Sequence, residues 1–296
     1  MNAPNVPTFH GQTSSGQGVL LPARTKERRS RSLLVEISSR DRNIRTHPST
    51  SQFRWRFQRP LKDILSIQLV GGTIPTRFYN IDVGWNTFFF KERLATYTIT
   101  IPPGLYTLTQ LTTVLTTLLN AISGLSNTYR VYTTDTSDCL ITQRLTGTAN
   151  FGYLFADADL YDLNNCLTMM NSPARMMGFM NDDYEDTSGI LISPNAADVD
   201  FLLNRIYLFL NHDNNQDLGT IERTVGKPNP HAIIYMDTKN PYKTFTKDVF
   251  QPLFVSSPAP VARLTTLDIN LTDEWSRPIN LQGRDITLTL EVVYLE

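Results

Sequence analysis

The chain has 296 residues and a mass of 33.6 kDa, which is enough for one large β domain or two small ones with a real core. Its 27 Lys and Arg residues nearly balance 28 Asp and Glu residues, which excludes a protein that binds polyanions over its whole surface. Charged residues make up 19% of the chain, less than the roughly 25% usual for soluble proteins. Such a surface suits a subunit packed against neighbours, and equally an ordinary β protein rich in Thr and aromatic residues.

The N-terminus and the two cysteines indicate the compartment. Residues 1–18 are polar and carry no apolar run of the kind found in signal peptides. No stretch approaches the ~20 apolar residues that span a bilayer. We therefore expect synthesis in a reducing cytoplasm with free thiols at Cys139 and Cys166, although a disulfide between them stays open.

Residues 1–31 differ from the rest of the chain. They contain Pro, Gly, Ser, Asn and Gln and little that can be buried, so the segment cannot offset its own ordering entropy. We expect an extended basic arm that binds a partner, with an acidic protein preferred over nucleic acid and both left open. The partner-binding residues predicted in this arm are an apolar anchor and a basic cluster: Leu20, Leu21, Arg24, Lys26, Arg28, Arg29 and Arg31.

From Ser32 onward, apolar residues recur with the period of two that is typical of β-strands. A long apolar run at 61–74 is expected to break at Gly71-Gly72. The alternation is clearest near the end, over residues 267–271 and 286–294. Further strands are predicted at 33–37, 53–57, 88–90, 97–101, 129–132, 139–144, 190–192, 206–210, 232–236 and 242–254.

One amphipathic helix is predicted after Thr107 and before Gly124. Its threonines have poor helix propensity, so it must dock a leucine stripe on a sheet. A weaker helical pattern covers residues 159–170. The stripe consists of Leu108, Leu111, Leu115, Leu118 and Leu119.

Roughly a dozen strands, one good helix and no strand–helix–strand rhythm favour a mainly β fold. We predict an antiparallel jelly-roll β-sandwich with one helix and long loops over residues 32–296, preceded by the arm at 1–31. A compact double jelly roll is the alternative fold.

No constellation of catalytic residues is visible, so we expect a protein that is not an enzyme and has no cofactor or metal. The cysteines form no CxxC motif, and no nucleotide-binding or nucleophile-elbow motif occurs. Two acidic stretches, 182–186 and 212–217, lack the order of a calcium loop and are interpreted as solvated surface loops. The four histidines are scattered along the chain: His10, His47, His212 and His231.

Residues 53–57 alternate Phe, Arg, Trp, Arg and Phe. Aromatics interleaved with arginines can form a stacking platform for single-stranded nucleic acid. In a strand, however, the period of two sends the aromatics to one face and Arg54 and Arg56 to the other. We therefore interpret this segment as a core strand.

Several segments, in this order, resemble one family: the minor capsid proteins of nucleocytoplasmic large DNA viruses, the group of the chlorella viruses and iridoviruses. The resemblance covers about residues 33–295. It rests on the segments 38–42, 53–57, 61–75, 79–81, 104–106 with the following helix, 174–179, 264–273 and 283–291.

The resemblance implies a late, jelly-roll virion protein of a large DNA virus, made in the host cytoplasm and present in many copies per particle. It would cement major capsid capsomers in an icosahedral shell, with the major capsid protein and other minor capsid proteins as partners. Contact with an internal membrane or the genome stays open. The alternative from the residues is a carbohydrate-binding attachment module that uses exposed Trp85, Trp275 and tyrosines.

Overall fold

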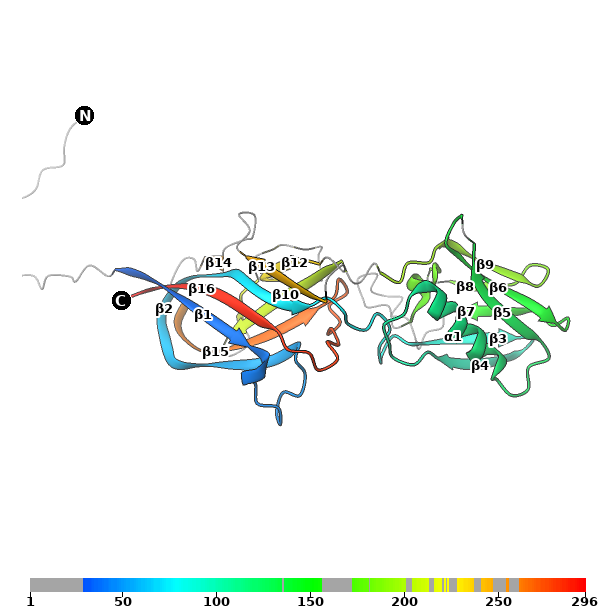
Figure 1. Cartoon of the computed structure of the whole chain (residues 1–296), viewed down its shortest axis with the longest axis horizontal. Helices are drawn as coiled ribbons and strands as arrows, with labels where there is room; N and C mark the ends of the chain where they lie inside the picture. The colour runs from blue at the N-terminus through cyan, green and yellow to red at the C-terminus, as the bar shows by residue number, and fades with distance from the viewer. Residues whose placement is uncertain are drawn as a thin grey trace, which may run out of the picture.

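The computed structural model (Figure 1) is mainly β, and every strand pairing in the part that it describes is antiparallel. The fold class predicted from the sequence, mainly β with one amphipathic helix, is thereby confirmed for these residues. The structure describes residues 29–134, 136–155, 172–180, 182–200, 204–212, 216–219, 221, 223, 228–236, 241–246, 254–255 and 261–296. The weak helical pattern at 159–170 lies outside them.

The first lobe is a nine-stranded sheet in the order β1-β16-β2-β15-β10-β11, with β12 on β10 and with β13 and β14 on β2. It combines the first strands of the chain with the last ones, and in Figure 1 it curls on itself. Its strands are β1 (Ser30–Ser38), β2 (Gln52–Pro75), β10 (Arg205–His212), β11 (Gln216–Asp217), β12 (Ala232–Tyr235), β13 (Tyr242–Thr246), β14 (Phe254–Val255), β15 (Val261–Thr272) and β16 (Thr287–Leu295).

The strand β2 is 24 residues long and joins the two segments that the sequence analysis predicts separately. The predicted break at Gly71-Gly72 is wrong, because the strand runs through both glycines to Pro75. These glycines instead admit a close approach of other strands. A Cβ atom on Gly72 would lie 2.5 Å from the Thr287 carbonyl oxygen, so the residue must be small for β2 to pair with β16.

The aromatic–arginine segment at the start of β2 is a core strand, as predicted. Phe53 and Phe57 are buried, and the Trp55 ring meets Phe57 edge-on at 4.6 Å. Arg54, on the opposite face, holds both carboxylate oxygens of Asp268 on β15, at 2.6 and 2.7 Å. The arginine therefore ties two strands together, and the aromatics fill the interior.

The core of the first lobe also buries a histidine. His231 is fully buried, and its Nδ1 lies 3.0 Å from the Leu218 carbonyl oxygen, to which it donates. Burial lowers the pKa of His231 to about 4, and the bond to Leu218 opposes that shift only in part. The ring is therefore neutral near pH 7 and serves as a polar core residue.

The second lobe is inserted between β2 and β10 and lies beside the first along the long axis in Figure 1. It contains a four-stranded sheet, β4-β3-β7-β8, and a three-stranded sheet, β5-β6-β9. The strands are β3 (Thr87–Glu92), β4 (Ala95–Thr100), β5 (Thr128–Thr133), β6 (Cys139–Thr146), β7 (Phe151–Leu154), β8 (Asp183–Glu185) and β9 (Ile190–Ala196), and the helices are α1 (Leu108–Asn120) with the short 3-10 turn η2 (Ala174–Met177).

The predicted helix is α1, and its leucine stripe docks on the second-lobe core as expected. Thr107 caps its N-terminus by accepting from the Gln110 amide, while the Gln110 side chain accepts from the Thr107 amide. The helix ends at Asn120, earlier than Gly124. Polar residues of the helix also bond to β5. Thr116 Oγ1 contacts both backbone groups of Val131, and Asn120 does the same for Tyr129.

Aromatic rings fill the space between the two sheets of the second lobe. Phe90 lies between Tyr129 and Phe151, and Tyr153 meets Phe88 edge-on at 5.3 Å. Burial raises the pKa of both tyrosines, so their hydroxyls stay protonated. Each hydroxyl has a partner: Tyr129 donates to Glu92 at 2.5 Å, and Tyr153 lies 2.6 Å from the Thr142 hydroxyl. The lobe thus has a rigid, fully bonded interior.

The described residues bury two separate apolar clusters, one in each lobe. Both clusters fall within the stretch 32–296 that the sequence analysis assigns to one sandwich domain, and that division of the chain stays a prediction. The ordered strand β1 begins at Ser30, so the sheet already includes the last residues of the expected arm. Gly178, with φ at +82°, makes a tight bend after η2.

Leu288→Asp should strongly destabilise the first lobe, because Leu288 is fully buried in its core. An unpaired carboxylate there costs about 3 kcal/mol or more, which corresponds to a fall in melting temperature of roughly 6–12 °C. Thr287→Asp is the matched control, since Thr287 precedes it on the other face of β16. Thermal unfolding followed by circular dichroism measures both. Equal melting of the two variants would contradict the assigned face.

Candidate interaction surfaces

The structure places the end of the predicted arm beside the C-terminus. The Arg29 carbonyl oxygen accepts from the Glu296 amide at 2.9 Å, and the Arg31 guanidinium forms an ion pair with the Glu296 side chain. Both arginines are exposed. Arg31 belongs to β1, an edge strand whose Leu33 and Leu34 are exposed. The other predicted partner-binding residues, Leu20, Leu21, Arg24, Lys26 and Arg28, lie outside the described residues.

The two acidic stretches are not simple loops. Residues 183–185 form β8. The Asp186 carboxylate, 1% exposed, accepts from the amides of Phe151 and Gly189 and lies 3.7 Å from Arg144. In the second stretch, His212 ends β10 and is buried, and Gln216 begins β11. The prediction of solvated loops is therefore wrong at Asp186 and His212, because local sequence does not show which loop residues are covered by other strands.

Within the described ranges, no three His, Cys, Asp or Glu side chains gather as a metal site. Cys139 carries a free thiol and is half-buried, while Cys166 lies outside those ranges. None of the described helices is long and apolar enough to cross a membrane.

A stacked arginine joins the two lobes. The Arg277 guanidinium lies 4.0 Å from the ring centroid of Trp85, at the entry to the second lobe, and 4.5 Å from that of Trp275. Arg277 donates through Nε to Asp273 at 2.6 Å, and both side chains are almost fully buried. Burial lowers the pKa of Arg277, and the Asp273 carboxylate opposes this shift. We call Trp85, Asp273, Trp275 and Arg277 the joint.

The joint is supported from both sides. Trp275 comes from the connection between β15 and β16 but packs on the second-lobe core. Asn80 binds the segments that enter and leave the second lobe, donating to the carbonyl oxygens of Tyr106 and Val199 at 2.8 and 3.1 Å. The half-buried Trp85 and Trp275 rings hold a guanidinium. The expected use of these tryptophans as exposed sugar-binding platforms is therefore wrong.

The three-stranded sheet of the second lobe presents an apolar outer face. Tyr132, Ile141 and Ile192 lie in one row across its strands, and Arg130, Gln143 and Ile190 form the next row. Leu145 lies beside them, at the bulge in β6. Ile190, Ile192 and Leu145 are 39%, 54% and 56% exposed, whereas Ile141 is 8% exposed. The inward residues of the same strands are buried in the second-lobe core. We call Tyr132, Ile141, Leu145, Ile190 and Ile192 the outer face.

The edges of this sheet differ from each other. Helix α1 bonds to the outward backbone groups of β5 at Tyr129 and Val131, so that edge is covered. The other edge is β9, where both backbone groups of Ile190 bond to Thr187 at 3.0 and 3.2 Å and Pro194 has no N–H to offer. An edge strand offers unpaired backbone groups to another chain. This edge is therefore closed in part, and the outer face rather than the edge is the candidate surface for contact.

Two segments of the family resemblance meet in the first lobe. Asp285 accepts from Ser39 Oγ at 2.7 Å and pairs with Arg40 and Arg42 at 3.2 and 3.3 Å. Burial alone would raise the pKa of Asp285, but the bond from Ser39 and the two arginines outweigh it and hold the pKa below its usual range. These contacts therefore join the segment that follows β1 to the segment that precedes β16.

Comparisons with known proteins give the following similarities. Residues 24–150 match a model described as "Family of unknown function (DUF5901)". No curated protein matches. Among solved structures, a mavirus penton protein is 9% identical with a TM-score of 0.39, covering 89% of this chain and 99% of its own. A chain of the Sputnik virophage structure is 12% identical with a TM-score of 0.33, covering 89% and 98%. Neither transfers a residue role to this chain.

Removing the charge at the joint should destabilise the protein. Arg277→Ala removes the counter-charge of the buried Asp273 carboxylate, which keeps only the backbone amides of residues 275 and 277 as partners, and the loss should be about 3 kcal/mol. Asp273→Asn/Arg277→Ala should lose clearly less than the sum of the two single changes, because it removes both charges. Chemical denaturation of the four proteins measures this coupling. Additive losses would mean that the ion pair contributes nothing to the joint.

Proposed function

We propose that this protein is a non-catalytic minor capsid protein of a large DNA virus, which binds and cements major capsid capsomers. The sequence resemblance over residues 33–295 supports the group, and the mainly β architecture agrees with it. The observation that carries the proposal is the outer face, with its exposed Ile190 and Ile192. A soluble β protein normally alternates apolar inside with polar outside.

The outer face is built for protein contact rather than for a small ligand. Its side chains come from paired strands of a sheet backed by the aromatic core, so their positions are fixed before binding. Arg130, on the same face, lies over the Tyr132 ring at 5.2 Å. Apolar, aromatic and arginine side chains together are typical of protein interfaces.

The arm would supply a second attachment from the other lobe. Its described end at Arg29 leads into the edge strand β1, where Leu34 is 65% exposed. Basic residues in an extended segment form charge-assisted hydrogen bonds with carboxylates or phosphates. The proposed partners are the major capsid protein and other minor capsid proteins, in the virion.

Ile192→Asp tests the outer face. Because Ile192 is 54% exposed, the melting temperature should stay within a few degrees of the natural protein. Binding to purified major capsid capsomers should fall at least tenfold, since a charge would have to be desolvated at the contact. Thr98→Asp, on exposed β4, is the control for added charge. Sedimentation of the protein with capsomers is the measurement, and unchanged binding of Ile192→Asp would overturn this role of the face.

Deletion of residues 2–28 tests the arm. The deletion stops before Arg29 because Ser30 opens β1 and Arg31 pairs with Glu296, so the fold should melt normally. Incorporation into particles should drop sharply. A full-length variant with Arg24, Lys26 and Arg28 changed to Gln should lose part of the binding and its salt dependence. Normal incorporation of the truncated protein would show that the arm is a passive tail.

A further inference from the structure

The turn between β3 and β4 breaks the local rules of a tight hairpin. Glu92 pairs with Ala95, so Arg93 and Leu94 alone form the turn. Arg93 has φ at +56°, a left-handed conformation that Gly, Asn or Asp adopts more readily at this position. Leu94 is 98% exposed. No side-chain contact within the described residues explains why an arginine has this conformation or why a leucine is exposed here. Such exceptions to local preference are characteristic of functional sites.

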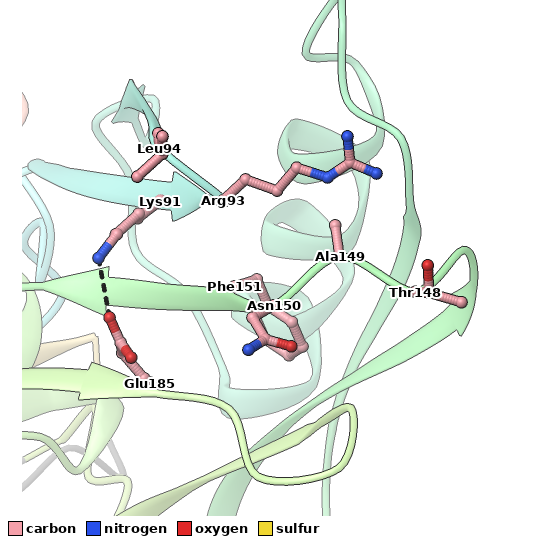
Figure 2. A pocket seen from close by; sticks show the side chains of 8 residues that line it. All are labelled: Lys91, Arg93, Leu94, Thr148, Ala149, Asn150, Phe151 and Glu185. Carbon is pink, nitrogen blue, oxygen red and sulfur yellow. Dashed lines mark hydrogen bonds and ion pairs between the residues drawn. The ribbon is translucent and has the colours of Figure 1, made fainter.

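A pocket of about 500 Å³ opens beside this turn, within the size range of ligand pockets. The turn and β3 form one wall, and the loop before β7 forms another (Figure 2). We call it the turn pocket. Its lining residues are Lys91, Arg93, Leu94, Thr148, Ala149, Asn150, Phe151 and Glu185.

Hydrogen bonds fix the walls of the turn pocket. The Arg93 amide donates to the Asn150 carbonyl oxygen at 2.9 Å, which ties the turn to the opposite loop. Ala149 is held by Asn127, at 2.8 and 3.2 Å, and by Arg144 at 2.6 Å. Behind the turn, buried Glu92 accepts from the Ser126 amide at 2.6 Å. The pocket is therefore formed before any ligand arrives.

The charges of the turn pocket favour a carboxylate. Lys91 is paired with Glu185 at 2.8 Å, whereas no ion pair of Arg93 occurs among the described residues. Two cations and one anion line the pocket, so one positive charge is left over. In Figure 2 the Arg93 side chain extends away from the Lys91–Glu185 pair and over Ala149.

The apolar features favour a protein segment over a sugar. The aromatic residue of the pocket, Phe151, is 2% exposed and offers no ring face on which a sugar could stack. Leu94 instead projects as an apolar knob next to a cation, and apolar anchors with arginine are typical of protein interfaces.

We propose that the turn pocket binds an acidic segment of a neighbouring protein, with a carboxylate on Arg93 and an apolar residue against Leu94. This inference rests on the proposed function, in which the neighbour is another shell protein. Arginine suits the role because its planar fork can hold a carboxylate with two hydrogen bonds.

The test separates folding from binding. Arg93→Gly should melt at the same temperature or higher, because glycine accepts the positive φ without strain. Gln282→Gly is the matched control, since Gln282 is also exposed with φ at +56°, in the first lobe. Binding of each full-length protein to purified capsomers is measured by sedimentation. We expect a loss of at least fivefold for Arg93→Gly, a larger loss for Arg93→Glu, and none for Gln282→Gly.

A photo-reactive residue at position 94 identifies the occupant. We expect a cross-link to a segment of another shell protein that contains Asp or Glu, and a change of that acid to Lys should restore binding of Arg93→Glu. Natural binding by both Arg93 variants, or a cross-link to a glycan, to this chain itself or to a segment without acidic residues, would overturn the inference. If the natural protein does not bind capsomers at all, the proposed function is wrong. If it binds but the Arg93 variants bind equally well, only the role of the turn pocket is wrong.

Discussion

The length of β2 is the constraint on which the architecture depends. Twenty-four residues in a flat strand would extend about 80 Å, far more than a domain of this size can bury. The strand must therefore bend. Register shifts occur in its pairing with β15 between Leu264 and Thr266 and in its pairing with β16 near Leu290, and such irregularities bend and twist a sheet. The curled sheet encloses the first-lobe core as a result.

The same strand delivers the chain to the second lobe, and the joint fixes how the two lobes meet. Arg277 binds Trp85 on one side and Trp275 with Asp273 on the other. Because the guanidinium is buried, it is strongly held only while its carboxylate and both rings are in place. The joint therefore fixes where the outer face and the turn pocket of the second lobe lie relative to β1 on the first.

In the second lobe, a helix covers one edge of the three-stranded sheet, and Thr187 closes part of the other. The Thr-rich sequence of α1, unfavourable for an isolated helix, places Thr116 and Asn120 where they bond to β5. Edge strands that stay open invite pairing with other chains. Because β5 is covered and Ile190 of β9 is bonded to Thr187, the outer face rather than a sheet edge is left for contact with the proposed partners.

The sequence by itself determined the local elements. Alternation of buried and exposed residues identified β1 and β16, and the leucine stripe after Thr107 identified α1, because burial of one face leaves its period in the chain. The basic arm stays a prediction from the sequence, made because residues 1–31 contain little that can be buried. Of the partner-binding residues predicted from the sequence, only Arg29 and Arg31 belong to the part of the chain that the structure describes.

Only the tertiary structure decided how these elements combine. It joined 53–57 and 61–74 into β2, separated two cores, buried Asp186, and brought Trp85 onto Arg277. The outer face and the turn pocket likewise depend on strands distant in the chain, such as β3 and β8. The apolar period of a strand or helix shows that one of its faces is buried, but it does not show which residues cover that face. Those residues are determined by long-range strand pairing and packing.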